Sequence, residues 1–171
     1  MEISKNYKRI AILRGGISDE CKISKLTADQ VYKTLQNKFS VQIIEVTKNC
    51  KKLLEDIDKS KPDVIFNCLH GYFGEDGQIQ TRLEESGIPF TGTDARGSAL
   101  AFNKELTRQV FAQESIPIPR GCILTGDSSV PHDDLKPPWV LKPAAQGSSV
   151  GLRMVEKKTE LESALEDSIK Y

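Results

Sequence analysis

The sequence predicts an α/β protein with a parallel sheet in its first half and a smaller mixed segment after it. Three short apolar runs, Arg9–Leu13, Val41–Val46 and Val64–Leu69, are typical of strands that are buried on both faces. Two segments of helical period separate these runs. Because strand–helix–strand units pack as right-handed crossovers, this order favours parallel strands with helices on the faces of the sheet.

The first predicted strand ends in a glycine turn, Arg14–Glu20, that leads into a helix. Apolar residues recur along this helix at roughly helical spacing, at Ile23, Leu26, Ala28, Val31 and Leu35. The Gly-x-Gly-x-x-Gly pattern of dinucleotide-binding folds is missing, which excludes that class of site. The helix N-terminus still offers free amides and a positive dipole end beside the turn. A second helix is expected over Cys50–Lys59, and Pro62 ends it.

The third strand leads into the loop His70–Gly77, which reads His-Gly-Tyr-Phe-Gly-Glu-Asp-Gly. In open α/β sheets, ligands gather outside the carboxyl ends of the strands. The three glycines permit close approach of a ligand, but they suit a plain loop before the helix Gln78–Ser86 equally well. A single histidine after a strand is more often structural than catalytic, so these residues alone leave both interpretations open.

The stretch Trp139–Gly151 has the pattern of a phosphate-binding hairpin. Its apolar start predicts a short strand, Lys142 follows at the strand end, and Pro143 cannot donate a further ladder hydrogen bond. Gly147–Ser149 is small enough for backbone amides to point at an anion. The Walker pattern is absent, and an ordinary hairpin with a solvated lysine fits these residues as well. A second strand is expected over Val150–Val155.

The remaining elements connect these stretches. The region around Ser98–Lys104 is the expected domain boundary. The predicted elements are, in chain order, a turn and short strand at Gly87–Gly92, a helix at Glu105–Gln113, a strand at Gly121–Leu124, an exposed loop at Gly126–Pro138 that carries a surface His132, and a helix at Lys157–Lys170.

Composition narrows the class of protein. In 171 residues, 38% are hydrophobic and 28% are charged, which is typical of a folded globular chain. Lys+Arg and Asp+Glu both number 24, so nothing suggests a nucleic-acid or anionic-membrane partner. The polar N-terminus is not expected to be a secretory signal. Four widely spaced cysteines argue against zinc or a disulfide framework and favour a reducing cytoplasm.

Four stretches resemble the D-alanine–D-alanine ligases, a family of ATP-grasp enzymes, and they occur in the family's order. The similarity runs from about Arg9 to the C-terminus. The stretches are Gly-Gly-x-Ser-x-Glu at Gly15–Glu20, His-Gly-x-x-Gly-Glu-Asp-Gly at His70–Gly77, Gly-Ile-Pro-Phe-Thr-Gly at Gly87–Gly92 followed by Ser98–Lys104, and Lys-Pro-x-x-x-Gly-Ser-Ser-Val-Gly at Lys142–Gly151. One departure is Lys22, where the family often carries an acid.

The resemblance implies a role for each matching residue. Glu20 would hold the ammonium group of the first D-alanine, His70 would lie beside that substrate, and Glu75 would support the loop. Without the resemblance, Glu20 would merely favour the helix dipole, and Lys104 would be one of many solvated helix lysines. Glu20 and Ser148 are the implied catalytic pair, with Ser148 bonded to Glu20. The implied ATP-binding residues are Lys104, Lys142, Gly147, Ser148, Ser149 and Val150.

The resemblance also implies the fold and the reaction. Residues 1–102 would form a Rossmann-like pre-ATP-grasp domain that binds D-alanine, and residues 103–171 would form the incomplete first lobe of an ATP-grasp domain. The family joins two D-alanines through a D-alanyl phosphate in peptidoglycan synthesis, using ATP and Mg²⁺, in the cytoplasm and as a homodimer. A ligase of the D-alanine–D-lactate type is an alternative. The residues that choose the second substrate are expected mostly beyond Tyr171.

The segments that supply the family's magnesium ligands are expected after Tyr171. We therefore expect the chain to be a truncated gene product or a proteolytic remnant that is inactive alone. Two alternatives are a non-catalytic module that binds D-alanine or nucleotide, and an inert α/β remnant. Two structural expectations also follow from the resemblance. Glu20 and Ser148 should approach each other across a cleft with His70 on the same side, and Ala144–Ser149 should be among the most mobile segments.

Overall fold

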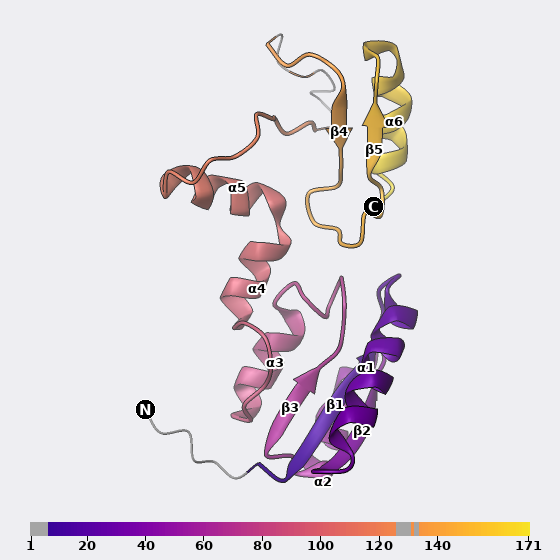
Figure 1. Ribbon diagram of the computed structural model, residues 1–171, viewed down its shortest axis with the longest axis vertical. Helices are drawn as coiled ribbons and strands as arrows, with labels where there is room; N and C mark the ends of the chain where they lie inside the picture. Colours follow the sequence, from indigo (N-terminus) through magenta and orange to yellow (C-terminus); the bar gives the residue numbers. More distant parts are fainter. Residues whose placement is uncertain (1–6, 126–130, 132–133) are drawn as a thin grey trace. The chain divides into compact units, whose positions relative to one another are not determined.

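The computed structural model describes residues 7–125, 131 and 134–171. The chain divides into two compact units, Met1–Ala99 and Leu100–Tyr171, and the division falls inside helix α4 (Ala95–Phe102; Figure 1). The expected boundary region, Ser98–Lys104, contains this division, and the assignment of residues 1–102 and 103–171 to two domains stays a prediction. The expected surface position of His132, and most of the loop around it, lie outside the described residues.

A three-stranded parallel sheet forms the centre of the first unit, as the sequence predicts. Its strands are β1 (Arg9–Gly15), β2 (Ser40–Val46) and β3 (Val64–Asn67), in the order β2-β1-β3. Ile12 of the central strand pairs with Ile43 on one side and Phe66 on the other. The side chain of Ile12 is completely buried, as a strand covered on both faces requires.

The third strand is shorter than predicted because an asparagine side chain turns the backbone. The strand ends at Asn67 rather than at Leu69, and the Leu69 amide donates to Asn67 Oδ1 at 3.1 Å. The expected strand in Gly87–Gly92 is reduced to a single parallel bridge between Ile65 and Phe90.

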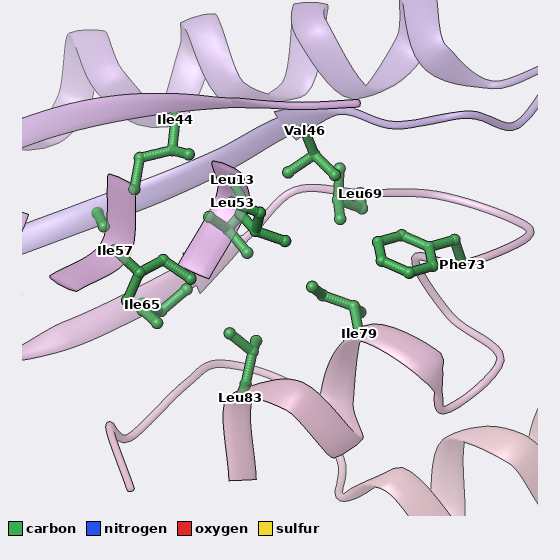
Figure 2. Close-up of a cluster of buried hydrophobic side chains, with 11 residues drawn as sticks. Leu13, Ile44, Val46, Leu53, Ile57, Ile65, Leu69, Phe73, Ile79 and Leu83 are labelled. Atoms are coloured by element: carbon green, nitrogen blue, oxygen red, sulfur yellow. The ribbon is translucent and has the colours of Figure 1, made fainter. Parts of the chain in front are cut away.

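Helices cover both faces of this sheet. Helix α1 (Cys21–Leu35) packs on the face that carries Ile10 and Ile12. Helices α2 (Cys50–Ser60) and α3 (Gln78–Ser86) pack on the opposite face. Figure 2 shows the larger of the two cores, which consists of Ala11, Leu13, Ile44, Val46, Leu53, Ile57, Ile65, Leu69, Phe73, Ile79 and Leu83.

The first half of α1 contacts the sheet through small residues, whereas Val31, Tyr32 and Leu35 pack against the sheet core farther along the helix. Ser24 and Ala28 are fully buried, whereas Ile23 and Leu26 are 51% and 60% exposed. The reason is the close approach of α1 to the end of β1, where the buried Gly15 amide donates to Ser24 Oγ at 2.9 Å. Helical period alone does not distinguish this polar contact from an apolar one.

The second unit is built on an antiparallel hairpin. Strands β4 (Trp139–Leu141) and β5 (Arg153–Val155) pair, and helix α6 (Leu161–Ser168) follows the short 3₁₀ helix η1 (Lys158–Glu160). One face of the hairpin packs on α6, where Val155, Leu161, Ala164 and Leu165 form a core with Leu124, Trp139 and Leu141. On the other face, Val140 and Met154 pair with each other and are 54% and 57% exposed.

In this half of the chain two sequence predictions are wrong and one helix was missed. Helix α4 was not anticipated; it ends just before Asn103, which caps helix α5 (Lys104–Gln113) by accepting from the Glu105 and Leu106 amides. Gly121–Leu124 is irregular, because within the described residues it has no ladder partner. Val150–Leu152 lies in turns, so β5 begins only at Arg153.

No helix among the described residues has the length and apolar character needed to cross a bilayer.

Removing the Ser24 hydroxyl should destabilise the first unit. Ser24→Ala leaves the buried Gly15 amide without its acceptor, which typically costs about 1–3 kcal/mol of unfolding free energy. Thr34→Ala is the matched control on the same helix, because the Thr34 hydroxyl is exposed and bonds to the carbonyl of its own helix. Urea unfolding measures both variants, and equal stabilities would contradict a structural role for the Ser24 contact.

One of the four cysteine thiols is buried, and the other three are partly exposed. Cys68 is 2% exposed, and burial raises the pKa of its thiol to about 11. At pH 8 its thiolate fraction is then ~10⁻³. A thiol reagent at pH 8 should modify Cys21, Cys50 and Cys122 in the folded protein and reach Cys68 only after denaturant is added. Modification of all four cysteines at similar rates without denaturant would refute the burial of Cys68 at the end of β3.

Candidate functional site

The glycine turn and the histidine loop meet in the first unit. They follow β1 and β3, which are parallel neighbours, so both leave the same edge of the sheet. The Ser18 hydroxyl donates to the His70 carbonyl at 2.7 Å and accepts from the Glu20 amide at 3.2 Å. One side chain therefore holds both segments in register.

Glu20 lies directly against the histidine loop. A Cβ atom built on Gly71 would lie only 2.9 Å from Glu20 Oε1, and Gly71 has a φ of +67°. The positive φ favours glycine at this position, and the short distance shows how closely the Glu20 carboxylate approaches the loop backbone. Glu20 precedes α1, but its side chain makes no capping hydrogen bond to that helix. In an ordinary helix start, the side chain of the capping residue accepts a hydrogen bond from an amide of the first turn. The Glu20 carboxylate makes no such bond.

His70 is held between an alcohol and a carboxylate. Its Nε2 lies 3.2 Å from Thr27 Oγ1, and its Nδ1 lies 3.7 Å from Glu75 Oε1. The other Glu75 oxygen accepts from the Gly71 amide at 2.7 Å. The structure thus brings the three predicted substrate residues, Glu20, His70 and Glu75, together around Gly71.

Buried side chains fix the rest of the loop. The Gly74 carbonyl accepts from Gln80 Nε2 at 2.8 Å and from Asn67 Nδ2 at 3.2 Å. Asp76 accepts from the Phe73 amide at 2.9 Å. The sequence interpretation missed Thr27, Asn67 and Gln80, because nothing in a helix or strand pattern marks a polar residue as a support for a distant loop. Such support preorganises a site for binding.

The charges of this cluster suit a small cation. Glu20 and Glu75 are acceptors when they are ionised, and the carbonyls nearby are acceptors as well. The side chain of Glu75 is about half exposed and that of His70 is 28% exposed, so both can be reached from solvent. An ammonium group is the natural ligand for such a set of oxygens.

In the second unit, Lys104 is bound to the hairpin loop. Its Nζ donates to the Gln146 carbonyl at 2.6 Å, and its amide donates to the Ala144 carbonyl at 2.9 Å. Burial lowers the pKa of Lys104, and the positive charge of Lys142 lowers it further. Two ammonium groups that repel each other at the base of one loop create a site that favours an anion.

The tip of the loop is a tight turn made by serines. The Val150 amide donates to the Gly147 carbonyl at 3.0 Å, with positive φ angles of 51° at Ser148 and 60° at Ser149, as in a type I′ turn. Serine is an uncommon residue for this backbone conformation, and such strain clusters at ligand-binding sites. Within the described residues, neither the Ser148 nor the Ser149 amide donates a hydrogen bond.

The expected contact between Glu20 and Ser148 joins residues of different units and stays a prediction, as does the mobility of Ala144–Ser149. Among residues 7–125, 131 and 134–171, no group of three or more His, Cys, Asp or Glu side chains could hold a metal ion.

Neutralising Lys142 should raise the pKa of Lys104, because one of the two causes that lower it disappears. The variant is Lys142→Gln, and the observable is the titration of the Lys104 side-chain methylene signals in NMR spectra. Lys157→Gln, on the far side of β5 in the sequence, is the control and should leave the Lys104 titration unchanged. An unchanged titration in Lys142→Gln would show that the two ammonium groups do not share one site.

Two models of known protein families match parts of this chain. Residues 49–93 match the family model described as D-ala D-ala ligase N-terminus, and residues 128–171 match the model described as D-ala D-ala ligase C-terminus. A D-alanine–D-alanine ligase from Methylacidiphilum infernorum is 39% identical over 165 residues, which is 96% of this chain and 52% of the relative. The chain spans about half the length of the curated relatives it matches.

Solved structures agree with these matches. A D-alanine–D-alanine ligase from Bacillus anthracis complexed with ATP matches 96% of this chain and 56% of its own, with 30% identity and a TM-score of 0.83. A D-Ala:D-Ser ligase from Enterococcus faecalis matches 97% of this chain and 60% of its own, with 26% identity and a TM-score of 0.75. These neighbours have an α/β fold, and this chain matches somewhat more than half of each of them. Since two models of one family match in order and its relatives align over nearly the whole sequence, the chain belongs to the D-alanine–D-alanine ligase family.

Proposed function

We propose that the chain carries the D-alanine site and the phosphate-binding hairpin of an ATP-dependent D-alanine–D-alanine ligase of peptidoglycan synthesis. The observation that supports this most directly is the gathering of Glu20, His70 and Glu75 around Gly71. In this proposal residues 1–102 bind D-alanine and residues 103–171 bind ATP. Cytoplasmic location and a homodimer belong to the same proposal.

In the first unit, Glu20 accepts the ammonium group of the first D-alanine. A carboxylate that is not used as a helix cap and lies against a glycine backbone leaves room for a small substrate. Glu75 holds the loop through the Gly71 amide, so it keeps His70 beside the substrate. Preorganisation of this kind lowers the entropy that binding must overcome.

In the second unit, Lys104 and Lys142 offset the negative charge of the ATP phosphates. The amides around Gly147, Ser148, Ser149 and Val150 hold the γ-phosphate in the strained turn. Val140 pairs with Met154 across the hairpin, and the two side chains leave an exposed apolar surface that suits the base of a nucleotide.

The proposed reaction has two steps. The carboxylate of the first D-alanine attacks the γ-phosphorus, and the bond to the bridging oxygen of ADP breaks, which gives an acyl phosphate. The amine of the second D-alanine then attacks that carbonyl, loses its proton and expels phosphate. Positioning and charge neutralisation are the main contributions of a protein to such a transfer. A bond between Ser148 and Glu20 would link the nucleotide to the substrate.

Among the described residues no group of three or more His, Cys, Asp or Glu side chains could hold a metal ion, and no step above runs through a metal. For the 171-residue chain by itself we favour binding of D-alanine without turnover as the second candidate function. The choice of the second substrate is left open, because one structural neighbour is named a D-Ala:D-Ser ligase.

Glu20→Gln should weaken D-alanine binding at least about tenfold. A hydrogen bond that involves a charged partner contributes roughly 1.5–3 kcal/mol, and the amide keeps the shape of the side chain while it removes the charge. Isothermal titration calorimetry with D-alanine measures the affinity, and L-alanine is the ligand control. Glu85→Gln, on the exposed end of α3, is the matched protein control. Equal D-alanine affinities for Glu20→Gln and the parent would remove Glu20 from the site.

A further inference from the structure

Among the described residues, Thr27 makes the shortest polar contact to the imidazole of His70. The Thr27 Oγ1 atom lies 3.2 Å from Nε2. At the other ring nitrogen, Glu75 Oε1 lies 3.7 Å from Nδ1. Thr34, on the same helix, uses its hydroxyl in the ordinary way and donates to the Gln30 carbonyl four residues earlier at 2.9 Å. Within the described residues Thr27 makes no such bond, so its hydroxyl proton is available to the ring.

The position of the ring proton follows from the two neighbours. A carboxylate oxygen can only accept, so the approach of Glu75 favours hydrogen on Nδ1, the ring nitrogen that faces it. A neutral imidazole has one N–H group and one acceptor nitrogen, which makes Nε2 the acceptor. The Thr27 hydroxyl is then the donor. The Glu75 approach is too long for a good hydrogen bond, so the Thr27 contact fixes the ring more tightly.

We propose that Thr27 is a positioning residue that donates to His70 Nε2, holds the neutral imidazole in its Nδ1–H form and fixes the orientation of the ring beside the substrate. The imidazole χ2 torsion has a broad, roughly two-fold potential, so the ring needs an external contact to keep one orientation. The effect on D-alanine affinity rests on the proposed function, whereas the proton position does not.

Imidazole nitrogen NMR tests the proton position directly. The background protein is the full chain with His132→Gln, which leaves His70 as its single histidine. Long-range ¹H–¹⁵N correlations at a pH where the ring is neutral distinguish a protonated nitrogen from a bare one. The variants are Thr27→Val, which removes the hydroxyl at nearly constant shape, Thr27→Ser, which keeps it, and Thr34→Val as the control on the same helix.

The expected result is a protonated Nδ1 and a bare Nε2 in the background protein, in Thr27→Ser and in Thr34→Val. Thr27→Val should shift the ring toward the Nε2–H form. A background protein that already carries its proton on Nε2 overturns the proposal, whether or not Thr27→Val folds. An unchanged tautomer in a folded Thr27→Val overturns it as well.

A D-alanine titration of the same proteins tests the consequence for binding. Thr27→Val should bind D-alanine about fivefold more weakly, the size of one neutral hydrogen bond, and Thr27→Ser should restore most of the affinity. Unchanged affinity in Thr27→Val would overturn the positioning role. If the background protein binds no D-alanine, the proposed function fails, while the tautomer measurement still decides the Thr27 contact.

Discussion

The Ser18 hydroxyl is the contact on which the first unit's site depends. It accepts from the Glu20 amide and donates to the His70 carbonyl, so it joins two segments that are far apart in the sequence. Parallel pairing of β1 and β3 brings these segments to one edge of the sheet, but pairing alone does not set their spacing. With that spacing fixed, Gly71 can lie against Glu20, and Glu75 can hold the loop through the Gly71 amide.

In the second unit, positive charge and backbone amides gather at the end of a short hairpin. Its core covers one face of β4 and β5 and leaves Val140 and Met154 exposed on the other. Lys104 comes from a helix rather than from the hairpin, and its two hydrogen bonds to the loop join those elements. The positive φ angles of Ser148 and Ser149 cost conformational energy that an ordinary turn, made of glycine or asparagine, would avoid.

The sequence predicts the parallel sheet because buried strands leave a plain apolar signal, and Gln78–Ser86 is predicted with the bounds that the structure has. Prediction from the sequence fails where contacts between residues far apart in the chain determine the local structure. Ser24 is buried because a distant amide needs an acceptor, and Gly121–Leu124 has strand-like residues but pairs with no strand in the part of the chain that the structure describes. At the site, family motifs mark Glu20, His70 and Glu75, whereas Thr27 and Gln80 act through a single side-chain contact each, which no periodic pattern records.

In the proposed function, D-alanine binds at the edge of the first unit's sheet, between the glycine turn and the histidine loop. Amide chemical-shift mapping of the full chain during a D-alanine titration locates the bound ligand. We expect saturable shifts at the amides of Gly16, Glu20 and Gly71, with much weaker shifts from L-alanine at the same concentrations. Shifts confined to the hairpin around Lys142, or equal responses to the two enantiomers, would contradict the proposed function.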